Sequence, residues 1–170
     1  HLLNGQRIDG SLATRGHESR ACSRPARALV HDQAVERMVV EFVELLAESA
    51  GFTLVTPHWN PAYSDIIERQ LDAGNEVRLI TTESQRSLLT GSGIAAIEGS
   101  LDSDDLTVRL SEETLPFGLA IVDRQVALVG YRDGALRVLV ESDDPAVAEW
   151  TDRYLNGIEA TAKPVRKQIQ

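Results

Sequence analysis

Two short apolar strands separated by a helical segment occur within 30 residues of this sequence, and no other feature constrains the fold as strongly. Phe52–Thr56 and Val77–Thr81 are rich in β-branched residues, and Pro61–Asn75 between them is helical in pattern. Two strands joined through a helix are typically parallel neighbours with a right-handed crossover. The sequence therefore predicts an α/β fold whose sheet contains parallel strands.

A longer amphipathic helix precedes this unit. Over Ala34–Ala50 the apolar residues recur at helical spacing, namely Val35, Met38, Val39, Phe42, Val43, Leu45 and Leu46. We expect Asp32 to cap this helix and Gly51 to end it. The following helix begins at Pro61, because proline is favoured at the first helical position, and ends at Gly74-Asn75.

The second half of the chain is rich in strands. A third helical segment runs from Glu83 to about Leu89, and four strands follow it, namely Leu106–Leu110, Leu119–Val122, Val126–Val129 and Leu136–Val140. Asp123–Gln125 and Arg132–Gly134 are expected to be tight links in hairpins. The Asp-Gly pair in the second link favours a primed turn.

A final helix is expected from Pro145 to Ala162, with Ser142 or Asp143 as its cap and Pro164 as its stop. The predicted order of elements is α-βαβα-ββββ-α. This order describes an α/β sandwich in which helices flank a mixed β-sheet.

The chain is expected to divide into three parts. Residues 1–30 mix Gly, Ser, Arg and Pro without periodicity, which is typical of an irregular arm or linker. Residues 31–165 carry the pattern of a single domain, and residues 166–170 form a tail. Because the first residue is His, we interpret the sequence as a fragment or a processed chain.

The predicted domain is strongly acidic. From Ala28 to Ala162 it has nine Arg against 24 carboxylates, a formal net charge of −15. Affinity for a phosphate backbone comes from cationic side chains, so we expect the folded part not to bind DNA or RNA by itself. Of the 17 bases, 15 are Arg, and Lys occurs only at positions 163 and 167. This pattern is typical of halophilic archaea, although GC-rich coding also replaces Lys by Arg.

Several classes of protein are excluded by what the sequence lacks. It has no stretch of 18 uncharged apolar residues, which a membrane span would need, and no apolar signal-peptide segment at its start. We therefore expect a cytoplasmic protein. Cys22 is the single cysteine, and the four His residues match no ligand spacing, so neither a metal nor another cofactor is expected.

One hairpin has the layout of a catalytic motif. In LPFGLAIVDRQVALVGY, a strand leads to an Asp at a tight turn and a second apolar strand ends in Gly, as in the phospholipase D superfamily. The motif of that superfamily reads His, any residue, Lys, four residues, Asp. With Asp123 as its Asp, Pro116 replaces the His and Gly118 replaces the Lys. We expect a phospholipase D-like fold without the phosphodiesterase chemistry, because neither residue can act as a nucleophile or hold a phosphate.

Two segments resemble the C-terminal domain of archaeal winged-helix transcriptional regulators of the methanogenesis regulatory protein family, namely EVRLITTESQRSLL and LSEETLPFGLAIVDRQVALVGYRDGALRVLVESDDPAVAEWTDRYL. The likeness covers about Val35 to Pro164. It implies a domain that follows a DNA-binding winged helix and senses a signal, dimerises, or does both. Since 30 irregular residues cannot form a winged helix, contact with DNA is expected only through a domain absent from this chain.

Candidate ligand-binding residues lie where the parallel strands end. Ligands of open α/β sheets bind beyond the carboxyl ends of the strands, and the side chains there are those of His58, Trp59, Asn60, Tyr63 and Thr82. A flat aromatic face, a titratable ring and an amide suit a small polar or aromatic ligand. In the structural alternative, Trp59 packs against a helix while Asn60 and Thr82 cap helices.

Other residues also allow two interpretations. Arg109 would need a carboxylate or a ligand if it pointed inward, and it is ordinary surface charge if it points outward, which we favour. Trp150 and Tyr154 share one stripe of the last helix, where they either pack against the sheet or line a dimer interface. Phe117 and Tyr131 are expected to be structural.

The favoured interpretation is a non-catalytic domain of a homodimeric regulator. In it, a small-molecule effector near His58 and Thr82 shifts the pairing of two domains. The first alternative is a constitutive oligomerisation module without a ligand. The second is a small α/β enzyme with a different active site, although no nucleophile-elbow pattern surrounds Ser64 or Ser84.

Overall fold

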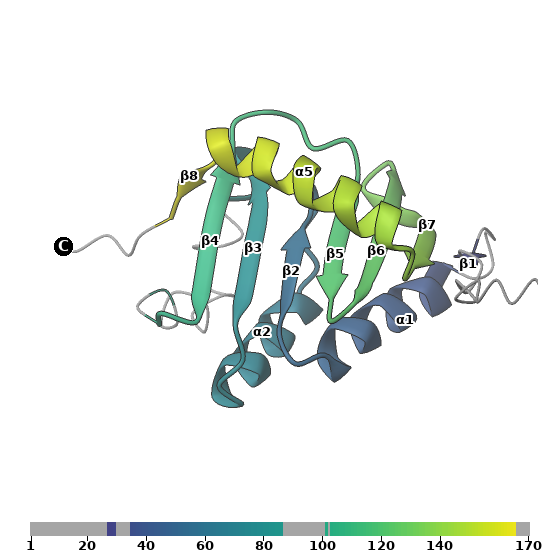
Figure 1. The fold of residues 1–170 in the computed structure, drawn as a ribbon, viewed down its shortest axis with the longest axis horizontal. Helices are drawn as coiled ribbons and strands as arrows, with labels where there is room; N and C mark the ends of the chain where they lie inside the picture. The colour runs from purple at the N-terminus through teal and green to yellow at the C-terminus, as the bar shows by residue number, and fades with distance from the viewer. Residues whose placement is uncertain (1–26, 30–34, 87–100, 102, 166–170) are drawn as a thin grey trace, which may run out of the picture.

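The computed structural model describes residues 27–29, 35–86, 101 and 103–165 (Figure 1). Its strands are β1 (Arg27–Leu29), β2 (Phe52–Val55), β3 (Val77–Thr82), β4 (Leu106–Ser111), β5 (Gly118–Val122), β6 (Gln125–Arg132), β7 (Ala135–Ser142) and β8 (Lys163–Pro164). Its helical elements are α1 (Val35–Glu48), α2 (Ala62–Asp72), the 3-10 turn η2 (Glu83–Gln85) and α5 (Pro145–Thr161).

The strands of the described residues form one mixed sheet, in the order β1-β7-β6-β5-β2-β3-β4-β8. Helices α1 and α2 lie on one side of it, and α5 runs across the other side (Figure 1). The predicted α/β sandwich is confirmed. Strand β2 is parallel to β3, as the strand–helix–strand pattern predicts, and antiparallel to β5, so the two kinds of pairing meet at β2.

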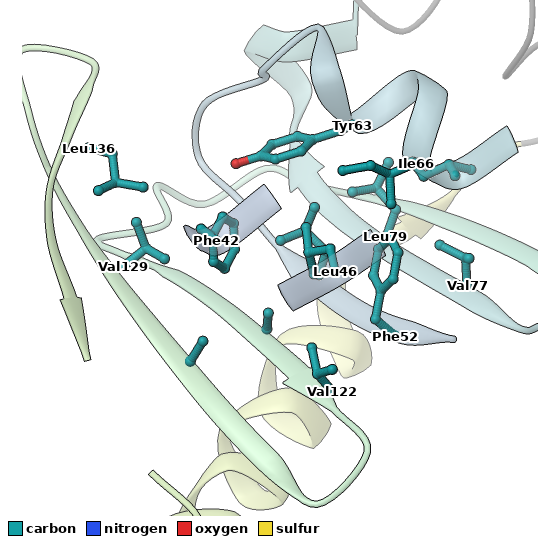
Figure 2. Close-up of a cluster of buried hydrophobic side chains, with 14 of the residues drawn as sticks. Phe42, Leu46, Phe52, Tyr63, Ile66, Val77, Leu79, Val122, Val129 and Leu136 are labelled. Carbon is teal, nitrogen blue, oxygen red and sulfur yellow. The ribbon is translucent and has the colours of Figure 1, made fainter. Parts of the chain in front are cut away.

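Each face of the sheet has its own apolar core. On one face, Met38, Phe42 and Leu46 of α1 and Ile66 of α2 pack against strand residues such as Leu79, as Figure 2 shows for this cluster. On the other face, Leu155 of α5 packs with a second set of strand residues, which includes Val55, Ile80, Leu119 and Val126. Strand residues alternate between the two faces, so β5 contributes to both cores.

Both hairpin links are tight, as the sequence predicts. Strand β5 ends at Val122 and β6 begins at Gln125, with Asp123 at a positive φ of 53° between them. Asp133 and Gly134, between β6 and β7, both have positive φ, at 53° and 76°. Two positive φ values in a two-residue link are the mark of a type I′ turn, which Asp-Gly favours.

Four local expectations need correction. Arg27–Leu29, expected to be irregular, form β1 because the edge of β7 offers them backbone partners (Arg27↔Glu141 to Leu29↔Leu139). Asp144, not Ser142 or Asp143, caps α5 by accepting a 2.8 Å hydrogen bond from the Ala146 amide. Pro145 fixes this start, because it occupies the first helical position.

The remaining corrections concern the ends of two other segments. The third helical segment begins as the 3-10 turn η2, and its expected continuation to Leu89 lies outside the described residues, as does the expected cap Asp32. Pro164, expected only to stop the last helix, belongs to β8, which pairs with β4 (Leu110↔Lys163).

A buried glutamine joins α1 to α2. The Gln70 side-chain amide donates to the carbonyls of Leu46 at 3.1 Å and Ser49 at 2.8 Å. Its oxygen accepts from the Gly51 amide at 3.2 Å and from Asn75 at 2.7 Å. Gln70 thus satisfies the last carbonyls of α1, which the helix itself leaves without partners.

Replacing Gln70 tests this junction. We expect Gln70→Met to lower the free energy of unfolding by about 3 kcal/mol, because buried carbonyls and an amide lose their partners while the volume is kept. Urea denaturation measures the change. The exposed neighbour Glu68→Gln is the control, and an equal loss in both variants would contradict the proposed role of Gln70.

Candidate functional site

The candidate site lies where β2 ends. Because β5 runs antiparallel to β2, with Val55 paired to Leu119, the first residue of β5, Gly118, lies at this end of β2. The chain leaving β2 carries Thr56 and His58, and Tyr63 follows on α2. Tyr131, at the end of β6, completes a group that we call the β2-end cluster, namely Thr56, His58, Tyr63 and Tyr131.

Thr56 organises the turn. Its side chain is fully buried, donates to the His58 carbonyl at 2.5 Å and lies 3.3 Å from the His58 amide. The Thr56 carbonyl in turn accepts from the Thr81 hydroxyl at 2.7 Å, which ties the ends of β2 and β3 together. The position of the His58 backbone is therefore fixed by hydrogen bonds.

Tyr131 lies at the centre of the cluster. Its phenol oxygen is 3.3 Å from the Thr56 hydroxyl, and its ring meets the His58 ring edge to face, with centroids 4.9 Å apart. Burial raises the pKa of the Tyr131 phenol, and hydrogen bonds with Thr56 and Tyr63 act in the opposite direction. His58 and Tyr131 are both half-buried, so solvent reaches part of the cluster.

Tyr63 anchors the cluster in the core. The residue is 3% exposed, and its ring packs edge to face against Trp59 at 5.6 Å and Phe42 at 6.2 Å. Figure 2 shows this ring above Phe42, with its oxygen directed toward the side where Leu136 lies. Burial raises the pKa of the Tyr63 phenol, and Tyr131 raises it further.

The structure assigns three of the predicted ligand residues a structural contact. The side-chain oxygen Oδ1 of Asn60 accepts from the Ala62 amide at 2.9 Å, so Asn60 caps the start of α2, as the structural alternative holds. Trp59 packs on α2, and its amide donates to the Gln85 side chain at 3.1 Å. The Thr82 hydroxyl bonds with that of Ser84 at 2.8 Å, rather than with a backbone amide of the 3-10 turn.

Arg109 is not part of this site. Its neighbours Val108 and Leu110 belong to the core under α1 and α2, so Arg109 points to the opposite face of the sheet. There it is half-buried and donates to the carbonyl of Ala162, at the end of α5, at 3.4 Å. Its side chain is therefore neither free surface charge nor near His58.

The aromatic residues of α5 form a separate group. Phe117, Trp150 and Tyr154, which we call the α5 aromatic stack, have centroids 5.1–6.1 Å apart and rings within 27° of parallel. Tyr154 is half-buried, whereas 40% of Trp150 is exposed. The two residues thus pack on their own chain, as one interpretation expected, and Trp150 also presents an aromatic face to solvent.

Sequence reasoning missed the role of Tyr131. Tyr131 packs on the same face of the sheet as Ala127 and Val129, as alternation along β6 predicts, but the sequence alone does not show that this position lies beside Thr56 and Gly118. The glycine at position 118 was a possible signal. A Cβ atom there would lie 3.1 Å from Cε2 of Tyr131, so the phenol ring rests where a side chain of residue 118 would begin.

The sheet order and the hairpin define the class of this domain. Solved structures with the same fold include NucT from Helicobacter pylori (TM-score 0.64, 15% identity, 82% of this chain and 98% of that chain). They also include Nuc from Salmonella typhimurium, described as a phospholipase D family member (TM-score 0.60, 15% identity, 83% of this chain and 97% of that chain). The chain is a phospholipase D-like α/β domain in which Pro116 and Gly118 replace the His and Lys of the catalytic motif.

The family follows from the sequence itself. The model of the methanogenesis regulatory protein FilR1 middle domain matches residues 35–159, and this chain belongs to that family. The fold is also similar to TrmBL2, described as an archaeal chromatin protein that shows a novel mode of DNA binding (TM-score 0.65, 16% identity). The likeness covers 82% of this chain and 54% of TrmBL2, so the chain spans about half of that protein. No curated protein matches the sequence.

None of the helices among the described residues is long and apolar enough to cross a membrane. Within the same part of the chain, no group of three His, Cys, Asp or Glu side chains is placed to hold a metal ion.

The buried phenols predict an alkaline limit to stability. Because the pKa values of Tyr63 and Tyr131 are raised in the folded state, the unfolded chain loses these protons first as the pH rises above about 10. We expect the free energy of unfolding to be constant below this pH on their account and to fall above it. Urea denaturation between about pH 8 and 11 measures the fall.

Tyr131→Phe should make this alkaline fall shallower, because one of the two shifted groups is removed. Tyr154→Phe, in the less buried α5 aromatic stack, is the matched control and should change the slope less. Equal slopes in the wild type and Tyr131→Phe would show that Tyr131 does not resist ionisation.

Proposed function

We propose that this chain is the signal-sensing domain of an archaeal transcriptional regulator, and that it binds a small molecule at the β2-end cluster rather than cleaving phosphodiesters. Its family membership supports a regulatory role. One observation supports ligand binding in place of catalysis. Gly118 occupies the position of the lysine in the catalytic motif, and the Tyr131 ring lies against it. A cationic phosphate site has become a neutral aromatic one.

The cluster offers suitable contacts for such a ligand. The half-buried rings of His58, Trp59 and Tyr131 provide flat apolar surfaces, and His58 and Tyr131 add polar atoms. A few polar groups on a mainly apolar surface are typical of small-molecule sites. The proposed ligand is therefore an uncharged or weakly charged polar aromatic compound.

Regulation requires that ligand binding change an arrangement of domains. We propose a homodimer in which Trp150 and Tyr154 of α5 contribute to the interface, because Trp150 is exposed and apolar. DNA is then bound by a winged-helix domain elsewhere in the full protein, since the acidic domain itself repels phosphate. A ligand shifts the arrangement only by as much as its affinities for the two states differ.

A thermal-shift screen of aromatic and polar metabolites tests the sensing function. A ligand at about a hundred times its Kd should raise Tm by about 5 °C or more. His58→Ala should abolish the shift, whereas Val40→Ala, on the exposed face of α1, should keep it. The sensing proposal fails if no compound shifts Tm, or if His58→Ala binds every hit unchanged.

The alternative of a constitutive oligomerisation module is favoured by the exposed Trp150 alone. Sedimentation analysis separates the two functions. A dimer that is insensitive to every compound in the screen supports the module, and a dimer whose sedimentation changes with a bound compound supports the sensor.

The loss of catalysis has its own test. We expect the purified chain to hydrolyse bis(p-nitrophenyl) phosphate no faster than buffer, because the residues at positions 116 and 118 cannot attack or bind phosphate. Hydrolysis that is equal in the wild type and in an Asp123→Asn variant would point to a contaminant. Turnover lost in that variant would overturn the non-catalytic assignment.

A further inference from the structure

Two aromatic groups on opposite faces of the sheet meet at one short segment. The β2-end cluster lies on the face covered by α1 and α2, and the α5 aromatic stack lies on the face covered by α5. Phe117 belongs to the stack, and its neighbour Gly118 contacts the cluster. Adjacent residues near the start of β5 thus serve opposite faces, as strand alternation requires.

The contact at Gly118 leaves no free space. A Cβ atom at this position would lie 3.1 Å from Cε2 of Tyr131, 3.2 Å from its phenol oxygen and 3.2 Å from Cβ of Val129. Contacts of this length are tighter than most Cβ contacts in proteins, so a neighbour would have to yield slightly. The Tyr131 ring and the backbone of residue 118 therefore cannot shift independently toward each other.

The contact at Phe117 is equally direct on the other face. Its ring stacks on Tyr154 with centroids 5.1 Å apart and on Trp150 with centroids 6.1 Å apart. Leu115 and Leu119, on either side, are 5% and 0% exposed and are held in the core under α5. A shift of the backbone at Gly118 therefore moves the Phe117 ring relative to Tyr154 and Trp150, although Pro116 on its other side is exposed.

We propose that Phe117 and Gly118 couple the β2-end cluster to the α5 aromatic stack, so that displacement of the Tyr131 ring changes the exposure of Trp150. This inference rests on the proposed function in one respect, since a ligand at the cluster is the natural cause of that displacement. Its structural part concerns residues that no ligand need touch. On this proposal, the surface of α5 around Trp150 changes when a ligand binds at the β2-end cluster.

Tryptophan fluorescence gives a direct test. The chain has two Trp residues, so Trp59→Phe leaves Trp150 as the single reporter. In this background we expect Gly118→Ala to shift the Trp150 emission maximum and its quenching by acrylamide, because the new methyl group pushes on the Tyr131 ring. Gly157→Ala, a glycine of α5 with nothing within 4 Å of its added Cβ, is the matched control and should change neither.

A double-mutant cycle assigns the effect to Tyr131. Tyr131→Phe removes the phenol oxygen, one of the atoms nearest the new methyl group, and keeps the ring in the core. We expect Gly118→Ala to cause a smaller Trp150 shift in the Tyr131→Phe background than alone, which is coupling between neighbours. If Gly118→Ala does not fold, Tyr131→Phe is tested instead. A Trp150 shift in Tyr131→Phe and almost none in the control Thr161→Ser supports the coupling, and equal shifts in both variants contradict it.

The outcomes separate this inference from the proposed function. A compound whose binding to the Trp59→Phe variant is established by isothermal titration calorimetry, yet which leaves Trp150 emission unchanged in that variant, overturns the coupling and leaves the sensor intact. If no compound binds but Gly118→Ala still shifts the Trp150 emission, the result supports the coupling and contradicts the sensing function. A Trp150 signal that depends only on protein concentration, and not on Gly118→Ala, assigns its changes to self-association and overturns the coupling.

Discussion

The antiparallel pairing of β2 with β5 is the constraint on which the rest of this structure depends. It joins a parallel unit, β2-α2-β3, to a run of antiparallel strands within one sheet. Because the two strands run in opposite directions, the end of β2 and the start of β5 lie at the same edge. Thr56 and Gly118, far apart in the sequence, are brought together only by this pairing.

At that edge this chain carries aromatic side chains on a phospholipase D-like fold. The catalytic motif of the phospholipase D superfamily needs a His and a Lys, and this chain has Pro116 and Gly118 at those positions. Glycine leaves room for the Tyr131 ring, which bonds to Thr56 and packs on His58. The substitution at one position and the side chain that fills its space are thus two parts of one structural change.

One short segment, Phe117–Gly118, has contacts on both faces of the sheet. Phe117 stacks on the aromatic residues of α5, and the adjacent Gly118 lies against the Tyr131 ring on the other face of the sheet. In the proposed sensor, such a link connects the surface that binds the effector to the surface that meets a partner domain. The formal net charge of −15 over Ala28–Ala162 disfavours contact of this domain with a phosphate backbone.

Sequence patterns predicted the elements of this fold well and the site only in part. The helix spacing of Ala34–Ala50, the Asp-Gly hairpin and Asn60 at the start of α2 all depend on neighbours within a few residues, and each was predicted. Tyr131 and Thr56 were not assigned to the site. Their contact depends on the pairing of β2 with β5 and of β5 with β6, which joins segments distant in the sequence.

The sequence by itself determined the α/β class, the acidic surface and the loss of the catalytic His and Lys, because periodicity, charge and residue identity are local properties. Only the tertiary structure decided that Arg109 faces α5, that Arg27–Leu29 extend the sheet and that Tyr131 fills the space beside Gly118. Each of these depends on which strand lies beside which. That choice is made by packing across the whole domain and by hydrogen bonding between segments distant in the chain.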